Sequence, residues 1–219
     1  MTLGIPTFVR QILGSVSFGI LNNAAGGYGD FAIASISLTF RLFMLLFMVL
    51  IGLAQGLQPL AGYNYRARNY GRVRATMRLV FVTALIIGTV AGTVGFALAP
   101  GIIGFFAPQD EAVVEMGSLA MRLMAVALVP IGMVVMFGGI FQALGDGRSA
   151  LLLAAGQQGL FLIPLVLVLP RYFGLTGVFA AQPAGFFLAF LIGLLLLRRT
   201  YRRLNDQEAD EQAVPVAAG

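Results

Sequence analysis

Residues 31–60 read FAIASISLTFRLFMLLFMVLIGLAQGLQPL, an apolar stretch in which Arg41 is the only ionised side chain. About 20 apolar residues in a helix are enough to cross the hydrocarbon core of a bilayer. The stretch is continuously apolar, whereas a strand of a membrane barrel would alternate polar and apolar residues over about ten positions. It therefore predicts a transmembrane helix.

Five further apolar runs accompany this one, so the sequence predicts an all-α, polytopic membrane protein with six transmembrane helices. The composition agrees, because 59% of the 219 residues are hydrophobic, 11% are charged and the mean hydropathy is +0.91. These values exclude a water-soluble enzyme. The chain has no Cys and no His, which excludes thiol and imidazole catalysis and zinc sites built from these residues. The predicted spans are residues 5–25, 31–60, 79–99, 117–144, 149–169 and 175–197.

The charged residues predict the orientation of these helices. All 14 basic residues are Arg, and they are densest in residues 63–78 and 198–203, whereas residues 107–115 carry acids and no base. Because arginine in short loops stays on the cytoplasmic side, both clusters and both chain termini are expected in the cytoplasm. Residues 1–203 then form one six-helix lobe, and the polar residues 204–219 are expected to be a disordered cytoplasmic tail.

Two of the predicted helices carry polar side chains that would cost free energy in contact with lipid. The first helix has a polar stripe at helical spacing: Gln11, Ser15, Phe18 and Asn22. The second has a mixed polar and thioether stripe, with Phe47 beside it: Arg41, Met44, Met48, Gln55 and Gln58. The stripes indicate either a cavity wall or hydrogen bonds between packed helices, and the residues alone leave both interpretations open.

The acidic residues and the glycines of the predicted spans give no sign of a functional site. No Asp or Glu lies deep within a predicted span, although proton- or sodium-coupled carriers usually need a carboxylate there. The pairs Gly52/Gly56 and Gly88/Gly92 have the G-x-x-x-G spacing, which we interpret as ordinary helix packing.

Residues 52–74 read GLAQGLQPLAGYNYRARNYGRVR, and this stretch resembles the multidrug and toxic compound extrusion (MATE) transporters. It is similar to the family's pattern Q-G-x-Q-P-x-x-G-Y-N-Y-G-A, at the end of the eighth helix and in the following cytoplasmic loop. Arg66 stands where the family usually has glycine. Residues 141–153 (FQALGDGRSALLL) and 164–183 (PLVLVLPRYFGLTGVFAAQP) resemble the region of helices ten to twelve.

The resemblance implies a transporter of twelve helices in two six-helix lobes, with a central cavity and export driven by Na⁺ or H⁺. This chain resembles the C-terminal lobe alone, in the branch of bacterial multidrug exporters. The resemblance places the carboxylate that binds the coupling ion in the N-terminal lobe, so no cofactor and no metal site are expected here. By helix, it assigns substrate contact to Gln11, Ser15, Asn22, Arg41, Met44, Phe47, Met133 and Phe137.

The implied function is the C-terminal half of a cation-coupled multidrug antiporter in the bacterial inner membrane, and not an enzyme. Its expected partners are amphipathic, often cationic small molecules, an N-terminal six-helix lobe or a second copy of the chain, and the lipid bilayer, without nucleic acid. Two alternatives stay open. One is a half-size carrier that acts as a dimer on lipid-like substrates, and the other is a non-transporting truncated chain or partner subunit.

Overall fold

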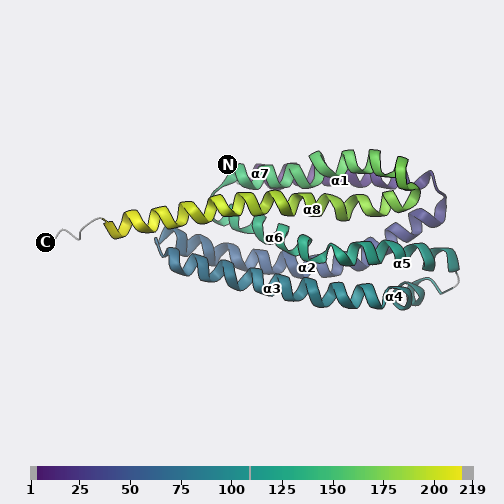
Figure 1. Ribbon diagram of the computed structural model, residues 1–219, viewed down its shortest axis with the longest axis horizontal. Helices are drawn as coiled ribbons and strands as arrows, with labels where there is room; N and C mark the ends of the chain where they lie inside the picture. Colours follow the sequence, from purple (N-terminus) through teal and green to yellow (C-terminus); the bar gives the residue numbers. More distant parts are fainter. Residues whose placement is uncertain (1–3, 109, 214–219) are drawn as a thin grey trace.

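The computed structural model describes residues 4–108 and 110–213, and within these ranges the chain is helical with no strand (Figure 1). The all-α prediction is therefore confirmed for the described residues. In chain order the elements are α1 (Gly4–Gly26), α2 (Asp30–Arg66), α3 (Tyr70–Ala97), α4 (Ala99–Phe106), α5 (Glu111–Val126), α6 (Leu128–Ala143), α7 (Gly147–Ala155), the π-helix η1 (Gly156–Phe161) and α8 (Leu162–Ala213).

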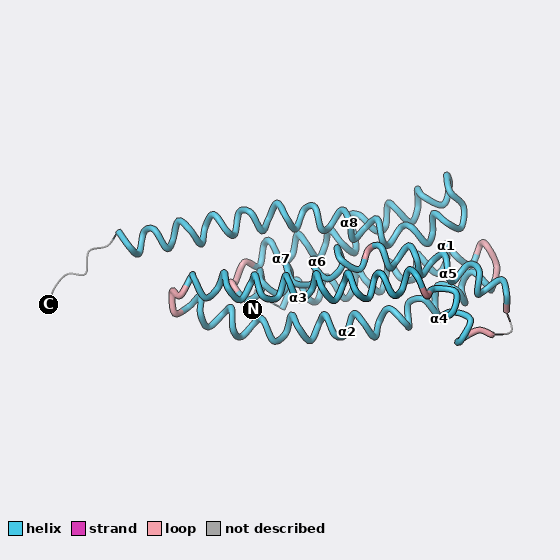
Figure 2. Tube along the Cα trace, turned by 60° about the horizontal axis from the view of Figure 1, so that its bottom comes forward, coloured by secondary structure: helices cyan, strands magenta, loops and turns pink. Residues whose placement is uncertain are grey.

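The helices lie side by side along the long axis of the molecule (Figures 1 and 2). We call each passage of the chain along the long axis of the bundle a leg. Helices α5 and α6 meet at a bend of 50° and together make one leg. Within α8, Gly174 has φ 56° and ψ −138°, which glycine adopts without steric cost and which reverses the chain. As a result, α7, η1 and the start of α8 form one leg, and the rest of α8 returns as the next.

Three segments of the described chain are long and apolar enough to cross a membrane: α2, α3 and the stretch Gly147–Ala209. The bent pair α5 and α6 would provide a fourth. Because Gly174 divides Gly147–Ala209 into two legs, the described helices occupy the places of all six predicted runs. The count of six membrane crossings itself stays a prediction.

Two clusters of apolar side chains hold the legs together. The larger cluster joins α2, α3, α6 and α8 around Leu57, Met77 and Phe137. The smaller cluster lies where α1, α2, α5 and α8 meet, around Leu21, Ile36 and Phe179. Burial of apolar surface inside the lobe therefore accounts for the packing of one side of each leg, and the other sides stay exposed.

The expected disordered tail is wrong as far as Ala213, because α8 continues as a helix through residues 204–213. Leu204 is buried against the larger cluster, and Glu208 reaches Arg74 near the start of α3 with an O–N distance of 2.5 Å. The acidic composition of this segment predicted a solvated, disordered chain, but Glu208 and Glu211 form ion pairs with arginines at the start of α3 and in the loop between α2 and α3. Residues 214–219 of the expected tail lie outside the described residues.

Candidate substrate-facing surface

Helix α2 has one buried side and one open side. Its buried side carries Leu50, Ala54 and Leu57, which pack into the larger cluster. Its exposed positions recur every three to four residues, as expected for one face of a helix: Arg41, Met44, Leu45, Met48, Val49, Gly52, Gln55 and Gly56. Most of the predicted stripe therefore lies on the side of α2 that the lobe leaves uncovered.

Helix α1 continues this uncovered surface. Gln11, Ser15 and Phe18 are exposed, whereas Leu21 and Ala25 are buried in the smaller cluster. The Ser15 hydroxyl donates to the Gln11 backbone carbonyl oxygen within the helix, at 3.1 Å, and the exposed Gln11 side chain adds an amide to the surface. The predicted stripe of α1 is thus exposed along its first three positions.

An aromatic contact joins the two helices. The rings of Phe18 on α1 and Phe40 on α2 meet edge to face, with centroids 5.2 Å apart and planes at 88°. This contact brings the exposed sides of α1 and α2 next to each other. We call the combined surface the open face, consisting of Gln11, Ser15, Phe18, Arg41, Met44, Met48 and Gln55.

Asn22 lies at the end of the α1 stripe and is half-buried. Its Oδ1 atom is enclosed, and among the described residues no group donates a hydrogen bond to it. An enclosed acceptor without a donor costs free energy. Asn22 therefore differs from the exposed positions of the stripe, because its Oδ1 atom faces into the lobe.

The structure does not bring all predicted contact residues to the open face. Phe47 and Met133 are partly buried against the larger cluster. Phe137 is only 1% exposed, and its ring centroid lies 5.5 Å from that of Phe81 and 6.0 Å from that of Phe190. The prediction that Phe137 contacts substrate is therefore wrong. Phe137 is a core residue, because the side of α6 that carries it packs between α3 and α8.

Helix α1 is held by a contact that the sequence did not indicate. Between α7 and α8 the helix continues as the wider π-helix η1. The Ser17 hydroxyl of α1 donates a hydrogen bond to the backbone carbonyl oxygen of Gln158 in this turn. Gly14 leaves room for the Gln158 side chain, whose Nε2 would lie 3.6 Å from a Cβ at position 14. Such π turns are frequent at functional sites. The two adjacent glutamines, Gln157 and Gln158, were the only signal in this segment.

The lobe alone does not enclose a substrate beneath the open face. A cavity of about 20 Å³ lies under the ring of Phe40, lined on its other sides by residues such as Leu21 and Gln182. This volume holds about one water molecule, whereas pockets for drug-sized molecules measure about 300 to 1,000 Å³. The open face therefore does not form a complete pocket by itself.

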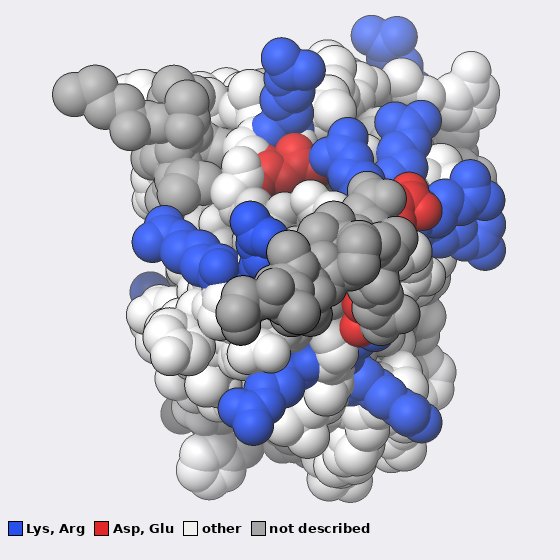
Figure 3. Space-filling view, turned by 90° about the vertical axis from the view of Figure 1, so that its left-hand side faces the viewer, with Lys and Arg blue, Asp and Glu red and all other residues white. Residues whose placement is uncertain are grey.

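Ion pairs gather at the end of the molecule that carries the loop between α2 and α3. Figure 3 shows arginine side chains surrounding this end, with acidic groups between them. Arg74 bonds Glu208 at 2.5 Å and the Asn205 side chain at 3.1 Å, and Arg68 lies 3.7 Å from Glu211. The last turns of α8 thereby contact the start of α3 through Arg74 and the preceding loop through the more exposed Arg68.

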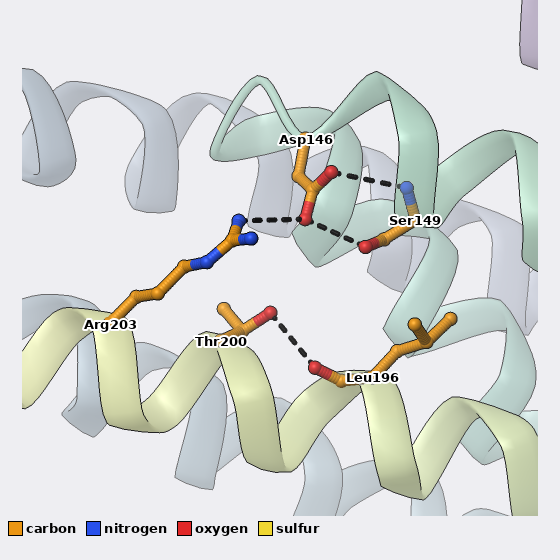
Figure 4. Close-up of polar contacts among 5 residues, drawn as sticks. All are labelled: Asp146, Ser149, Leu196, Thr200 and Arg203. Atoms are coloured by element: carbon orange, nitrogen blue, oxygen red, sulfur yellow. Dashed lines mark hydrogen bonds and ion pairs between the residues drawn. The ribbon is translucent and has the colours of Figure 1, made fainter.

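A third pair joins α8 to the loop between α6 and α7. One oxygen of Asp146 accepts from the backbone N–H of Ser149 and caps α7, and the other accepts from the Ser149 hydroxyl at 2.7 Å (Figure 4). That second oxygen also lies 3.6 Å from Arg203 Nη1. We call the pairs Arg74–Glu208, Arg68–Glu211 and Arg203–Asp146 the C-terminal clasp.

The family model MatE matches residues 6–168. The multidrug export protein MepA of Staphylococcus aureus (strain NCTC 8325 / PS 47) is 35% identical over 176 residues, which cover 80% of this chain and 38% of MepA. MepA of Staphylococcus saprophyticus is 31% identical over 208 residues, covering 95% of this chain and 46% of that protein. The chain thus spans less than half the length of these curated relatives.

A solved structure supports the same assignment at the level of the fold. The Vibrio cholerae MATE transporter VcmN in the bent form aligns with a TM-score of 0.86 at 18% identity, covering 94% of this chain and 47% of VcmN. The matched part of VcmN therefore has the helix arrangement described above. Because the MatE family model covers residues 6–168 and the apolar helices have this arrangement, the chain is an all-α membrane protein that belongs to the MATE family.

Proposed function

We propose that this chain is the C-terminal lobe of a multidrug exporter and that its open face forms one wall of the substrate cavity. The open face is the observation that carries the proposal. It leaves an arginine, two glutamines and two methionines uncovered on a chain that spans 38% and 46% of the two MepA relatives. A second six-helix lobe would cover these side chains and enclose the space between them.

The proposed substrates are amphipathic, often cationic small molecules. Met44 is 54% exposed and Met48 is 63% exposed, and thioether side chains adapt to ligands of different shapes. Phe18, at 43% exposure, adds a flat apolar surface beside them. This mixture suits a cavity that accepts many related compounds, as the name of MepA implies for that protein.

Coupling to Na⁺ or H⁺ is assigned in this proposal to the other lobe. The described residues contain no group of three or more acidic side chains that could hold a metal ion. The open face carries no carboxylate, and its only charge is Arg41, which is exposed. An arginine costs about 2.5 to 3.5 kcal/mol at a helix centre on insertion scales if lipid surrounds it. A carboxylate on the partner lobe is the natural partner for this guanidinium.

The test is transport of a cationic dye by reconstituted vesicles under a Na⁺ or H⁺ gradient. The purified chain alone should give no gradient-dependent export, and co-assembly with a six-helix N-terminal lobe should restore it. Gradient-dependent export by the chain alone would overturn the half-transporter proposal in favour of a dimeric carrier.

A variant at Arg41 tests the wall assignment separately. In the assembled two-lobe protein, Arg41→Gln should insert normally and change the rate or the substrate range of dye export. The matched control is Arg171→Gln, because Arg171 is also exposed but lies next to the Gly174 turn, outside the open face. Equal export by the native protein and both variants would contradict the wall assignment.

A further inference from the structure

A second surface, on the other side of the lobe from α1, has the features of a ligand site. Helix α3 packs closely on α5 and α6, because Gly88 and Gly92 face their backbones. A Cβ at position 92 would lie 2.8 Å from the Ala125 carbonyl oxygen. Beside this close contact runs an open groove of about 410 Å³, with walls that include Thr89, Thr93, Phe96, Val126 and Val129. Figure 1 shows α3 on the opposite side of the bundle from α1.

The walls of the groove are mostly apolar, although two threonines line it. The Thr93 hydroxyl donates to the Thr89 carbonyl oxygen at 2.8 Å, which satisfies the hydroxyl within α3. Phe96 and Val126 are exposed, at 49% and 57%. In a membrane protein, lipid hydrocarbon covers such a surface. The groove therefore offers a mostly apolar surface that suits a lipid acyl chain.

A positive charge lies at one end of the groove. The guanidinium carbon of Arg122, on α5, lies 5.7 Å from the centroid of the Phe96 ring. Arg122 is exposed, and no carboxylate of the described residues forms an ion pair with it. An anion that approaches the groove from the bilayer would thus meet an arginine whose charge is available.

The length of α3 places this arginine at the level of lipid headgroups. Arg78 is the last arginine of the cytoplasmic cluster, and Phe96 follows it by 18 residues on the same helix. At 1.5 Å per residue this separation is about 27 Å, close to the roughly 30 Å thickness of the hydrocarbon core. If Arg78 lies at the cytoplasmic headgroups, Phe96 and Arg122 lie at the headgroups of the opposite leaflet.

We propose that this groove binds one phospholipid of the outer leaflet. The guanidinium of Arg122 donates hydrogen bonds to the lipid phosphate, and one acyl chain lies in the groove between Phe96 and Thr89. Charge complementarity selects the headgroup, since an arginine recognises phosphate oxygens through two parallel donors. The site is separate from the open face and does not depend on the proposed transport function.

Native mass spectrometry of the full chain in detergent tests this site. Phosphatidylglycerol should bind as one tightly retained molecule per chain, and diacylglycerol with the same acyl chains should bind more weakly. Arg122→Gln should weaken phosphatidylglycerol binding by at least about tenfold, since it removes charge-assisted hydrogen bonds to the lipid phosphate. Arg171→Gln, which removes an exposed arginine elsewhere, should leave binding unchanged.

A second variant distinguishes loss of the lipid site from loss of the folded structure. Thr93→Phe fills the groove and leaves Arg122 in place, so it should also reduce lipid retention, and Arg122→Lys should restore part of it. Thermal unfolding in detergent establishes that each variant is folded. Retention of phosphatidylglycerol by folded Arg122→Gln at the native level, or equal binding of diacylglycerol, would overturn the proposal.

Discussion

Two glycine pairs with the same spacing have opposite environments. At Gly92, an added Cβ would lie 2.8 Å from the backbone oxygen of Ala125, and at Gly88 it would lie 3.0 Å from the Cα atom of Val129. At Gly52 and Gly56, by contrast, the added Cβ would have no described atom within 4 Å apart from the backbone of α2 around it. The G-x-x-x-G spacing therefore marks a tight helix contact in α3 and an uncovered surface in α2.

This difference predicts the effect of one added methyl group. Gly92→Ala should lower the free energy of unfolding by about 1 to 3 kcal/mol, because backbone atoms of α5 cannot move aside easily. Gly52→Ala is the matched control, and it should leave stability unchanged or raise it by up to about 1 kcal/mol through helix propensity. Thermal unfolding in detergent measures both. Equal destabilisation by the two substitutions would argue against the α3–α5 contact.

The pair of Arg74 and Glu208 is the closest contact of the C-terminal clasp, and both side chains are less than one third exposed. Glu208→Gln should lower the free energy of unfolding by roughly 1 to 2 kcal/mol, since it removes a charge-assisted hydrogen bond that solvent screens only in part. For a chain of this size the melting temperature should fall by about 2 to 8 °C. Arg72→Gln, at an exposed position near the same loop, should have little effect. A loss that is equally large for Arg72→Gln would point to a general charge effect and not to the pair.

At the scale of the elements, hydrophobic patterning located every leg of the bundle. The six apolar runs fall on α1, α2, α3, the α5–α6 pair and the two legs on either side of Gly174. Patterning could not predict the bend between Val126 and Leu128, because the residues around it are as apolar as those of a straight helix. At the π turn Gly156–Phe161, two adjacent glutamines interrupt the apolar run but do not by themselves indicate a wider helical turn. The end of α8 was also missed, since its acids find partners only through tertiary contacts.

The π turn predicts a specific role for one hydroxyl of α1. Ser17→Ala removes the hydrogen bond to Gln158 and should cost about 0.5 to 1.5 kcal/mol of stability. Hydrogen–deuterium exchange of the backbone amides in Gly156–Phe161 should become faster at the same time. Ser15→Ala is the control, because the Ser15 hydroxyl bonds only within α1. Unchanged exchange in Gly156–Phe161 would show that the turn is held by other contacts.

At the scale of the whole molecule, part of the candidate surface could be predicted from the sequence. The polar stripes located the uncovered sides of α1 and α2, because polar and thioether residues at helical spacing mark a face that is not buried in the lobe's core. Phe137 could not be placed, since an apolar ring serves equally well in a core or a cavity. Arg122 was hidden inside a predicted span, because its significance depends on Phe96, on another helix.

The orientation in the membrane is a further whole-molecule prediction. The native chain has no cysteine, so single cysteines report topology without background. In intact cells, Arg72→Cys should resist a membrane-impermeant thiol reagent, and Glu111→Cys at the start of α5 should react. Both sites should react once the membrane is permeabilised. The reverse pattern would place the two arginine clusters outside the cytoplasm.

The C-terminal clasp connects two loops to one helix, and this has a consequence for motion. Because α8 holds both the α2–α3 loop and the α6–α7 loop, these segments should turn together when the lobe tilts, as one rigid body. Spin labels on Arg72→Cys and Arg202→Cys should therefore give one narrow distance distribution in electron paramagnetic resonance. Glu208→Gln should broaden that distribution, because the end of α8 would then rotate independently of the loop between α2 and α3.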